Sequence, residues 1–310
     1  MVLTMKDLPD WNADIKELIP FSKVKLIISD IDGTLLESGS RHEHEKFNNL
    51  VSLLKRKGIH MTFATGRAYN GVKELINIFP ITKSFPLIIY NGSVCILPYD
   101  KKILYKKVID RECLLRLIKI TKKYNALLLA YEIDLPCGVD HKEITESVYA
   151  WGSFNESFSE PNGLQVKPQH KGDVYPVAAM IKNTQEPSIT KKIYYELNKI
   201  HGVTFTKSSN DYIEIRPVNS DKGLAVEIIS KEFNIEQDSI LTIGDNDNDV
   251  EMLEYAGVSV AVNNSSLAAR NAGKYASSGS NIVGLHETLE LIRQARHYLS
   301  VMEGSNDNIK

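Results

Sequence analysis

Short apolar runs alternate with amphipathic stretches near both ends of the chain. The run 24–29 precedes a stretch in which Phe47, Leu50 and Leu54 recur every three or four residues. The run has the length of a buried strand, and the stretch has the period of a helix. The same rhythm predicts strands over 60–64, 87–90, 239–243 and 258–262, and helices over 43–57, 68–78, 222–233, 248–256, 265–272 and 284–298. Such alternation is typical of a parallel sheet covered by helices.

The pattern changes between these two regions. Residues 94–97 and 103–105 flank a Pro-Tyr-Asp turn and predict a hairpin. Beyond them, helices are predicted over 109–124 and 187–200, and strands over 126–133, 174–181, 203–207 and 211–215. Residues 134–173 are polar and contain Gly, Pro, Asn and His, which predicts an elaborated loop. We therefore expect an inserted α+β unit over 108–216, within a core over 23–107 and 217–310.

The two ends of the chain lie outside this plan. Residues 1–22 form an N-terminal extension, in which Trp11, Ile15 and Leu18 have roughly helical spacing. This spacing favours a short amphipathic helix packed on the core. The tail from Ser305 to Lys310 is polar and is expected to be disordered.

Composition narrows the class of protein. The chain has 310 residues, of which 43% are hydrophobic and 25% are charged, as in ordinary globular proteins. Its formal net charge of -2 disfavours broad nucleic-acid binding, because affinity for a phosphate backbone needs a basic surface. Cys95, Cys113 and Cys137 lack the spacing of a zinc site or disulfide framework, which favours reduced thiols. Because the chain shows neither a bilayer-spanning apolar stretch nor a secretory signal, we expect a cytoplasmic protein.

Two carboxylates follow the first predicted strand. Asp30 and Asp32 come directly after the apolar run, at the end of a strand where open α/β sheets bind ligands. Gly33 allows a tight exit from the strand, so the two side chains can converge on one site. One carboxylate can then attack as a nucleophile while the other moves a proton. Capping of the following helix is the plainer alternative for an Asp-x-Asp pair.

Four short motifs, in order, resemble those of one family. Asp-Ile-Asp-Gly-Thr at 30–34 is followed by Ala-Thr-Gly-Arg at 64–67, Asp-Lys-Gly at 221–223 and Gly-Asp-Asn-Asp-Asn-Asp at 244–249. This series resembles the haloacid dehalogenase superfamily in its phosphatase form. The order of the motifs and their strand-then-helix contexts resemble the Cof-type subgroup, class IIB. The resemblance implies an α/β fold, with a Rossmann-like parallel-sheet core and an inserted α/β (class IIB) cap domain.

The resemblance also implies roles for the acidic residues. Asp30 would be the nucleophile that becomes an aspartyl-phosphate. Asp32 would protonate the leaving oxygen and later take a proton from the attacking water. Asp245 also follows a predicted strand, and with Asp30 it makes a hard oxygen site that suits Mg²⁺. The resemblance adds the backbone carbonyl of Asp32 as a further metal ligand, and Asp249 could hold the metal or contact substrate. The last acidic motif does not fit a calcium-binding EF-hand. An EF-hand loop needs a glycine at its sixth position and a glutamate at its twelfth, and this motif has neither.

Five further positions are expected to bind phosphate or substrate. Thr65 and the amides of Gly66 and Arg67 open a predicted helix, which makes them natural phosphate donors. A simple threonine N-cap is the alternative, and Arg67 could instead form a structural ion pair. Lys222 would neutralise phosphoryl charge, an assignment drawn mostly from the resemblance. The same resemblance makes Asn248 a substrate contact.

These features together predict a Mg²⁺-dependent phosphatase of small phosphorylated metabolites, with sugar phosphates first. Its partner is then a small-molecule phosphate ester, with no nucleic acid and no membrane, and the oligomeric state is left open. A phosphosugar mutase on the same core is the nearest alternative. A non-catalytic regulatory protein that binds phosphometabolites is the alternative from another class. A dinucleotide oxidoreductase is disfavoured because no Gly-x-Gly-x-x-Gly follows the first strand.

Overall fold

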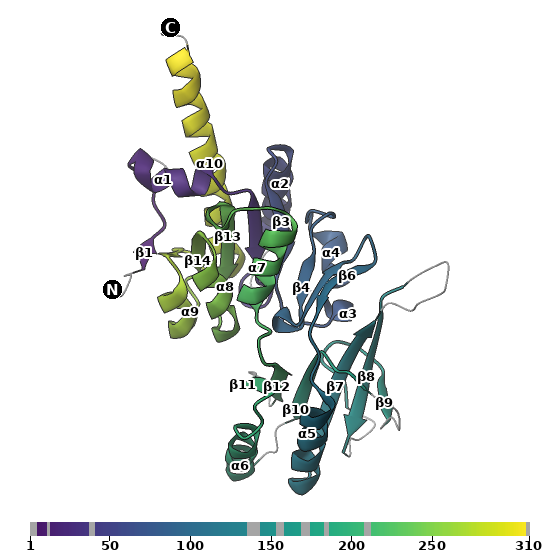
Figure 1. The fold of residues 1–310 in the computed structure, drawn as a ribbon. Helices are drawn as coiled ribbons and strands as arrows, with labels where there is room; N and C mark the ends of the chain where they lie inside the picture. Colours follow the sequence, from purple (N-terminus) through teal and green to yellow (C-terminus); the bar gives the residue numbers. More distant parts are fainter. Residues whose placement is uncertain are drawn as a thin grey trace. The chain divides into compact units, whose positions relative to one another are not determined.

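Two compact units make up the chain in the computed structural model (Figure 1). The first unit comprises Met1–Thr65, Ile76–Leu87 and Asp221–Lys310, and the second comprises Gly66–Leu75 and Ile88–Ser220. The structure describes residues 5–10, 13–36, 41–134, 143–152, 158–168, 174–182, 186–207 and 212–307. The bounds of the two compact units differ from the predicted domain boundaries at 23, 108 and 217. Those domain boundaries stay a prediction.

A six-stranded parallel sheet forms the centre of the first unit. Its order is β1-β15-β14-β13-β2-β3. The strands are β1 (Lys6–Asp7), β2 (Leu26–Ser29), β3 (His60–Phe63), β13 (Ile240–Gly244), β14 (Val258–Ala261) and β15 (Tyr275–Ala276). From β2 the chain passes to β3 on one side, and it later returns as β13 on the other. The carboxyl ends of β2 and β13 are therefore the topological switch point, where such sheets bind ligands.

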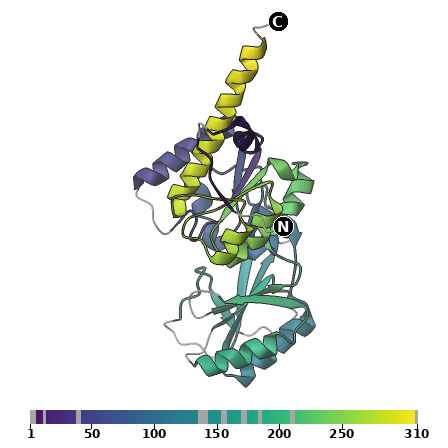
Figure 2. The same ribbon diagram turned by 90° about the vertical axis from the view of Figure 1, so that its left-hand side faces the viewer.

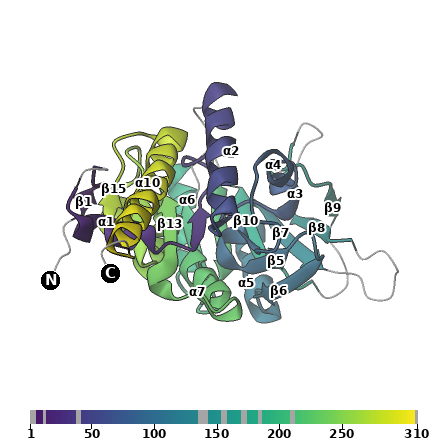
Figure 3. The same ribbon diagram turned by 90° about the horizontal axis from the view of Figure 1, so that it is seen from above.

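Helices cover this sheet in two rows. The first row is α1 (Ile15–Ser22), α10 (Asn281–Asp307) and α2 (Arg41–Arg56), and the second is α7 (Lys222–Glu232), α8 (Val250–Tyr255) and α9 (Leu267–Ala272). Seen from above, α10 and α7 lie on opposite sides of β13 (Figure 3). Strand β2 is buried along its whole length, which explains why it reads as a continuous apolar run. Figure 2 shows the last turns of α10, in yellow, extending past the sheet.

A second six-stranded sheet, largely antiparallel, forms the second unit. Its order is β11-β12-β10-β7-β8-β9. The strands are β7 (Leu127–Asp134), β8 (Thr145–Trp151), β9 (Val166–Pro168), β10 (Ala178–Lys182), β11 (Val203–Lys207) and β12 (Tyr212–Pro217). Helices α5 (Arg111–Lys123) and α6 (Pro187–Leu197) share an apolar core with this sheet, through residues such as Leu117, Ile193 and Ile215. A small sheet of β4 (Leu87–Ile89), β5 (Val94–Leu97) and β6 (Lys102–Lys106) precedes them in the chain.

This architecture confirms the predicted fold class: a parallel-sheet α/β core with an inserted α/β unit. Three local predictions are wrong. The predicted loop over 134–173 contains β8 and β9, because Val148 and Ala150 alternate inward among polar neighbours. The predicted helix over 68–78 is two short helices, α3 (Tyr69–Val72) and α4 (Leu75–Ile78), and Gly71 weakens the first. The predicted disordered tail is helical as far as Asp307, where α10 ends.

Other features of the sequence are found where expected or lie outside the described residues. Cys95 and Cys113 are buried free thiols, and burial raises the pKa of Cys95 to about 12. The predicted N-terminal helix appears as α1, although Trp11 is outside the described residues, as is Cys137. Among the helices that the structure describes, none has both the length and the apolar character needed to span a membrane.

Candidate active site

Asp30 lies at the end of β2, in the buried centre of the first unit. Its amide N donates to the carbonyl of Ile243 at 2.9 Å, which extends the β2–β13 ladder by one residue. Its residue surface is only 4% exposed. Because β2 and β13 are parallel neighbours, the residue after β13, Asp245, ends beside Asp30. The proximity of Asp30 and Asp245 follows directly from the parallel pairing, whereas the convergence of Asp30 with Asp32 stays a prediction.

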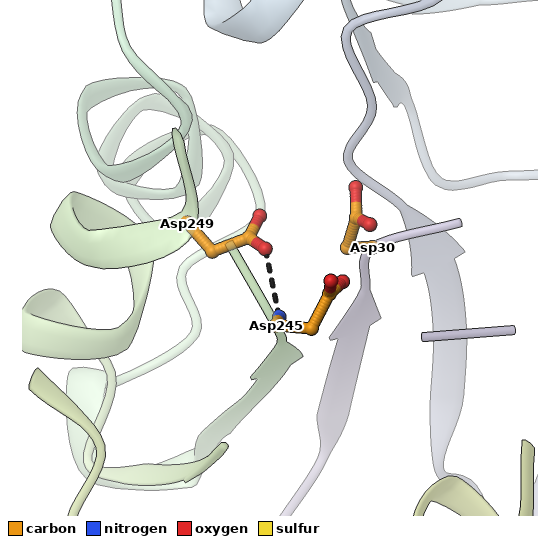
Figure 4. A group of neighbouring side chains, drawn as sticks. All are labelled: Asp30, Asp245 and Asp249. Carbon is orange, nitrogen blue, oxygen red and sulfur yellow. Dashed lines mark hydrogen bonds between the residues drawn. The ribbon is translucent and has the colours of Figure 1, made fainter. Parts of the chain in front are cut away.

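A third carboxylate completes a cluster at this edge. Asp30, Asp245 and Asp249 each offer one oxygen atom, and these atoms lie within 4.8 Å of one another (Figure 4). Asp249 is fully buried, and its Oδ2 accepts from the amides of Asp245 and Asn246 at 2.9 and 3.0 Å. These bonds cap the short 3₁₀ turn Asp247–Asp249 that leads into α8. The cap thus fixes the Asp249 carboxylate against the other two.

Lys222 faces the same cluster from the first turn of α7. Its Nζ lies 2.6 Å from Asp30 Oδ1 and 2.6 Å from Asp249 Oδ1, and its side chain is fully buried. Burial alone would lower the pKa of Lys222, but the Asp249 and Asp30 carboxylates outweigh it and raise the pKa. The lysine therefore stays charged. Because it bonds to both Asp30 and Asp249, it holds these two carboxylates next to each other.

The charges of this cluster do not balance. Three carboxylates against one ammonium leave an excess of two negative charges, if all are ionised. Burial raises the pKa of Asp30 well above its ordinary value; Lys222 opposes this shift and Asp249 adds to it. Hard oxygen donors with excess negative charge suit Mg²⁺, and a divalent cation here would favour the ionised form of Asp30. The donor set of this structure therefore fits the implied metal.

Asp32 and Gly33 form the turn that leaves β2. Asp32 is exposed and is not one of the three clustered carboxylates. Gly33 has φ +83°, and a Cβ built on it would come within 2.2 Å of Asp245 Oδ2. Both the positive φ and the close carboxylate therefore require glycine at this position. The turn brings the backbone against Asp245 while leaving the Asp32 side chain accessible.

Residues that the sequence analysis did not assign hold this turn and Asp245 in place. Thr34 Oγ1 donates to Asp245 Oδ1 at 2.8 Å, and Ser266 N donates to its carbonyl at 2.7 Å. The carbonyl of Gly33 accepts from the side-chain amides of Asn264 and Asn281, each at 2.8 Å. Thr34 could have been found, since it belongs to the first motif. Asn281 carries no such signal, because its partner is more than two hundred residues away.

The predicted phosphate and substrate residues are divided between the two units. Thr65, which is 1% exposed, follows β3 in the first unit, and Asn248 is half-buried in the 3₁₀ turn before α8. Gly66 and Arg67 belong to the second unit. There, a Cβ on Gly66 would lie 3.0 Å from the Asn91 side-chain amide, and Arg67 Nη1 donates to the carbonyl of Gly71 at 3.3 Å.

Comparisons with known proteins identify the family and agree with the fold. A model of the haloacid dehalogenase-like hydrolase family matches residues 27–289. Endoribonuclease YBEY of Arabidopsis thaliana chloroplasts is 24% identical over 248 residues, which cover 78% of this chain but only 42% of that protein. The 5-amino-6-(5-phospho-D-ribitylamino)uracil phosphatase YitU of Bacillus subtilis is 26% identical, over 78% of this chain and 88% of that protein. The structure of the subclass IIB sugar phosphatase BT4131 has a TM-score of 0.66 and 17% identity, over 87% of this chain and 100% of that one.

Proposed function

The chain belongs to the haloacid dehalogenase-like hydrolase family and is a Cof-type phosphoric monoester hydrolase, and we propose that it acts on small phosphorylated metabolites with Mg²⁺. We further propose that phosphoryl transfer passes through an aspartyl-phosphate on Asp30. The observation that carries this proposal is the Asp30 carboxylate, which is buried at the switch point and bonded to Lys222 at 2.6 Å. A carboxylate that only capped a helix would need no buried lysine beside it.

The first half-reaction forms the acyl phosphate. An oxygen of Asp30 attacks phosphorus, and the bond from phosphorus to the ester oxygen breaks. Asp32 gives its proton to that oxygen, which leaves as an alcohol. The exposure of Asp32 supports this role, since its side chain must reach a leaving group and later a water molecule.

The second half-reaction regenerates the enzyme. Asp32, now ionised, takes a proton from water as the water oxygen attacks phosphorus, and the Asp30–phosphorus bond breaks to release inorganic phosphate. Lys222 remains beside Asp30 throughout and offsets the charge that develops on the transferred group. Mg²⁺, when bound by Asp30, Asp245, Asp249 and the carbonyl of Asp32, would neutralise phosphoryl oxygens.

The remaining predicted residues bind the phosphoryl group and the substrate. We propose that Thr65 and the amides of Gly66 and Arg67 donate to phosphoryl oxygens, and that Asn248 contacts substrate. The position of Thr65 supports its proposed role. Thr65 follows β3, which is the parallel neighbour of β2, so it lies at the same edge of the sheet as Asp30.

We propose sugar phosphates and related polyol phosphates as the substrate class. YitU is named for a phosphate ester of a ribityl chain, and BT4131 is named as a sugar phosphatase. Both names describe phosphate on a polyhydroxylated carbon chain, which supports testing that class first. We also propose a cytoplasmic protein without nucleic-acid or membrane partners, in keeping with its net charge of -2.

The test is phosphate release from a panel of esters in the presence of Mg²⁺. The panel contains hexose phosphates, pentose phosphates, a phosphoribitylamino pyrimidine and a nucleoside monophosphate. We expect turnover of at least one polyol phosphate, and none with Asp30→Asn. A protein that isomerises a hexose phosphate without releasing phosphate would instead be a mutase. A wild-type protein that binds these esters but releases no phosphate would contradict the proposal.

A further inference from the structure

Three backbone amides at the start of α3 find their acceptors in distant parts of the second unit. The amide of Ala68 donates to Asn162 Oδ1 at 2.9 Å. The amides of Tyr69 and Asn70 donate to the two carboxylate oxygens of Glu146 at 2.7 and 2.6 Å. Ala68 has no polar side chain with which to cap the helix locally. Glu146 and Asn162 therefore replace the cap and hold the chain that directly follows Thr65.

The Glu146 carboxylate is itself held in place. It lies on β8, and its Oε1 also accepts from Tyr90 Oη at 2.6 Å. Burial raises the pKa of Glu146, while the Tyr90 hydroxyl and the two amides oppose this shift. Carboxylates are rarely taken out of water without such partners. All of these partners lie in the segment after Thr65 or in the turn after β4.

A second carboxylate of the second unit, which is buried, holds Asn162 in place. The amide N and Nδ2 of Asn162 donate to Glu160 at 2.8 and 3.0 Å. Glu160, 5% exposed, also accepts from Tyr131 Oη at 2.7 Å. Because the Nδ2 of Asn162 is engaged by Glu160, its Oδ1 points to the amide of Ala68. Its own carbonyl accepts from Asn70 Nδ2 at 2.9 Å, which gives a second bond to the same segment.

A small pocket in the second unit shares some of these side chains. Its lining includes Gly66, Tyr90, Tyr131 and Asn162. Among the described residues, Glu146 is not part of the lining. A contact between this pocket and a leaving group would therefore explain Tyr90 and Asn162, but it would not explain why the Glu146 carboxylate accepts from the amides of Tyr69 and Asn70.

We propose that Glu146 and Asn162 are positioning residues for the Gly66–Arg67 turn, so that its amides are fixed for the phosphoryl group. This inference rests on the proposed function, because it takes the turn to be a phosphate donor. The two bonds to Glu146 involve a charged acceptor and the bond to Asn162 Oδ1 comes from the buried Ala68, and such bonds hold geometry more firmly than exposed bonds between neutral groups. The hold acts on the phosphoryl end of the substrate and not on its leaving group.

The test compares Glu146→Gln with the wild type in two measurements. Glutamine keeps the shape, but it has one acceptor oxygen where the carboxylate has two, and its NH₂ would face a backbone N–H. We expect kcat/KM to fall roughly tenfold for every ester of a panel, and the affinity for inorganic phosphate, measured by calorimetry with Mg²⁺, to fall by a similar factor. The relative preference among esters should stay unchanged.

Matched controls separate this role from general damage to the unit. Glu196→Gln removes a surface glutamate that pairs with Lys123 and Lys199, and it should leave both measurements unchanged. Tyr90→Phe removes only the hydroxyl that holds Glu146, and it should give a smaller fall of about threefold. Tyr194→Phe should have no effect, because its buried hydroxyl has no partner among the described residues.

The outcomes distinguish this inference from the proposed function. Wild-type phosphate affinity in a folded Glu146→Gln protein would overturn the positioning role. A change in ester preference would overturn it too, because it would indicate a contact with the leaving group. If Glu146→Gln does not fold, the phosphate affinity of Tyr90→Phe tests the same role: a fall supports the positioning role, and wild-type affinity overturns it. If the wild type releases no phosphate from any ester, the proposed function fails, while the phosphate titration still tests the positioning.

Discussion

Both units bury acidic side chains, but they surround them differently. In the first unit, Asp30 and Asp249 share the ammonium of Lys222 and lie against a third carboxylate. In the second unit, the donors to Glu146 and Glu160 among the residues that the structure describes are all neutral N–H and O–H groups. A carboxylate surrounded by neutral donors keeps backbone in place and needs no counter-ion. The cluster with unbalanced charge is therefore the one we expect to bind a cation and react.

The largest effect should come from the candidate nucleophile. Asp30→Asn keeps the size of the side chain but replaces one oxygen by an NH₂ group and removes the attacking anion, so we expect at least a ~10³-fold loss of kcat. Asp247→Asn is the matched control, because Asp247 follows the neighbouring strand β13 but accepts from Ser266 Oγ and is not in the cluster. Phosphate release under saturating substrate measures both variants. Comparable rates for the two would remove Asp30 from the nucleophile role.

Metal removal should act on the first unit alone. We expect EDTA to abolish phosphate release and Mg²⁺ to restore it. The melting temperature of the wild type should also rise with Mg²⁺, because a ligand that binds only the folded state stabilises it. Asp245→Asn should lose most of that rise, whereas Glu146→Gln should keep it. A protein that stays fully active after dialysis against EDTA would break the comparison between the two acidic regions.

Replacement of Lys222 should show how much the unbalanced cluster depends on its one ammonium. Lys222→Met leaves the Asp30 and Asp249 carboxylates buried without their cation, and such losses cost about 3–5 kcal/mol. We expect Mg²⁺ to recover part of this stability, since it supplies positive charge at the same carboxylates. Urea unfolding with and without Mg²⁺ measures both effects. A stability equal to that of the wild type would mean that the lysine does not offset buried charge.

The smallest effects are expected for two glycine substitutions, which separate the cost of a strained backbone from the cost of a steric clash. Gly33 and Gly58 both have positive φ, but a Cβ on Gly58 would meet nothing within 4 Å, whereas one on Gly33 would meet Asp245. Gly58→Ala should cost about 1 kcal/mol and leave kcat unchanged. Gly33→Ala should cost more and also lower metal affinity, because Asp245 must move. Equal metal affinity in the two variants would show that the close approach is not required.

Much of the core chemistry could be predicted because it depends on simple geometry. The carboxyl ends of parallel strands share one edge of a sheet, so Asp30 and Asp245 could be brought together from their places after apolar runs. The predicted family and the Cof-type subgroup are confirmed, since the family model spans residues 27–289. The roles of the individual site residues stay predictions.

What could not be predicted depends on contacts between distant residues. The bonds from Asn281 to Gly33 and from Glu146 to Tyr69 have no local pattern, because neither partner constrains the sequence near the other. Strand β8 could not be recognised in the sequence because it has no continuous apolar run. Its buried residues Val148 and Ala150 alternate with partly exposed ones, and its first residues, such as Glu146, are polar. The helix predicted over 68–78 is interrupted between α3 and α4, and the residue that accepts from the first amides of α3, Glu146, lies on the distant strand β8.

The central claim is that carboxylates from β2 and β13 bind one divalent cation. The most direct measurement is a crystal structure of the protein with Mn²⁺, read by its anomalous scattering. We predict a single strong peak within coordination distance of Asp30 and Asp245. A fully occupied manganese ion elsewhere, with these two side chains bound only to protein, would contradict the claim.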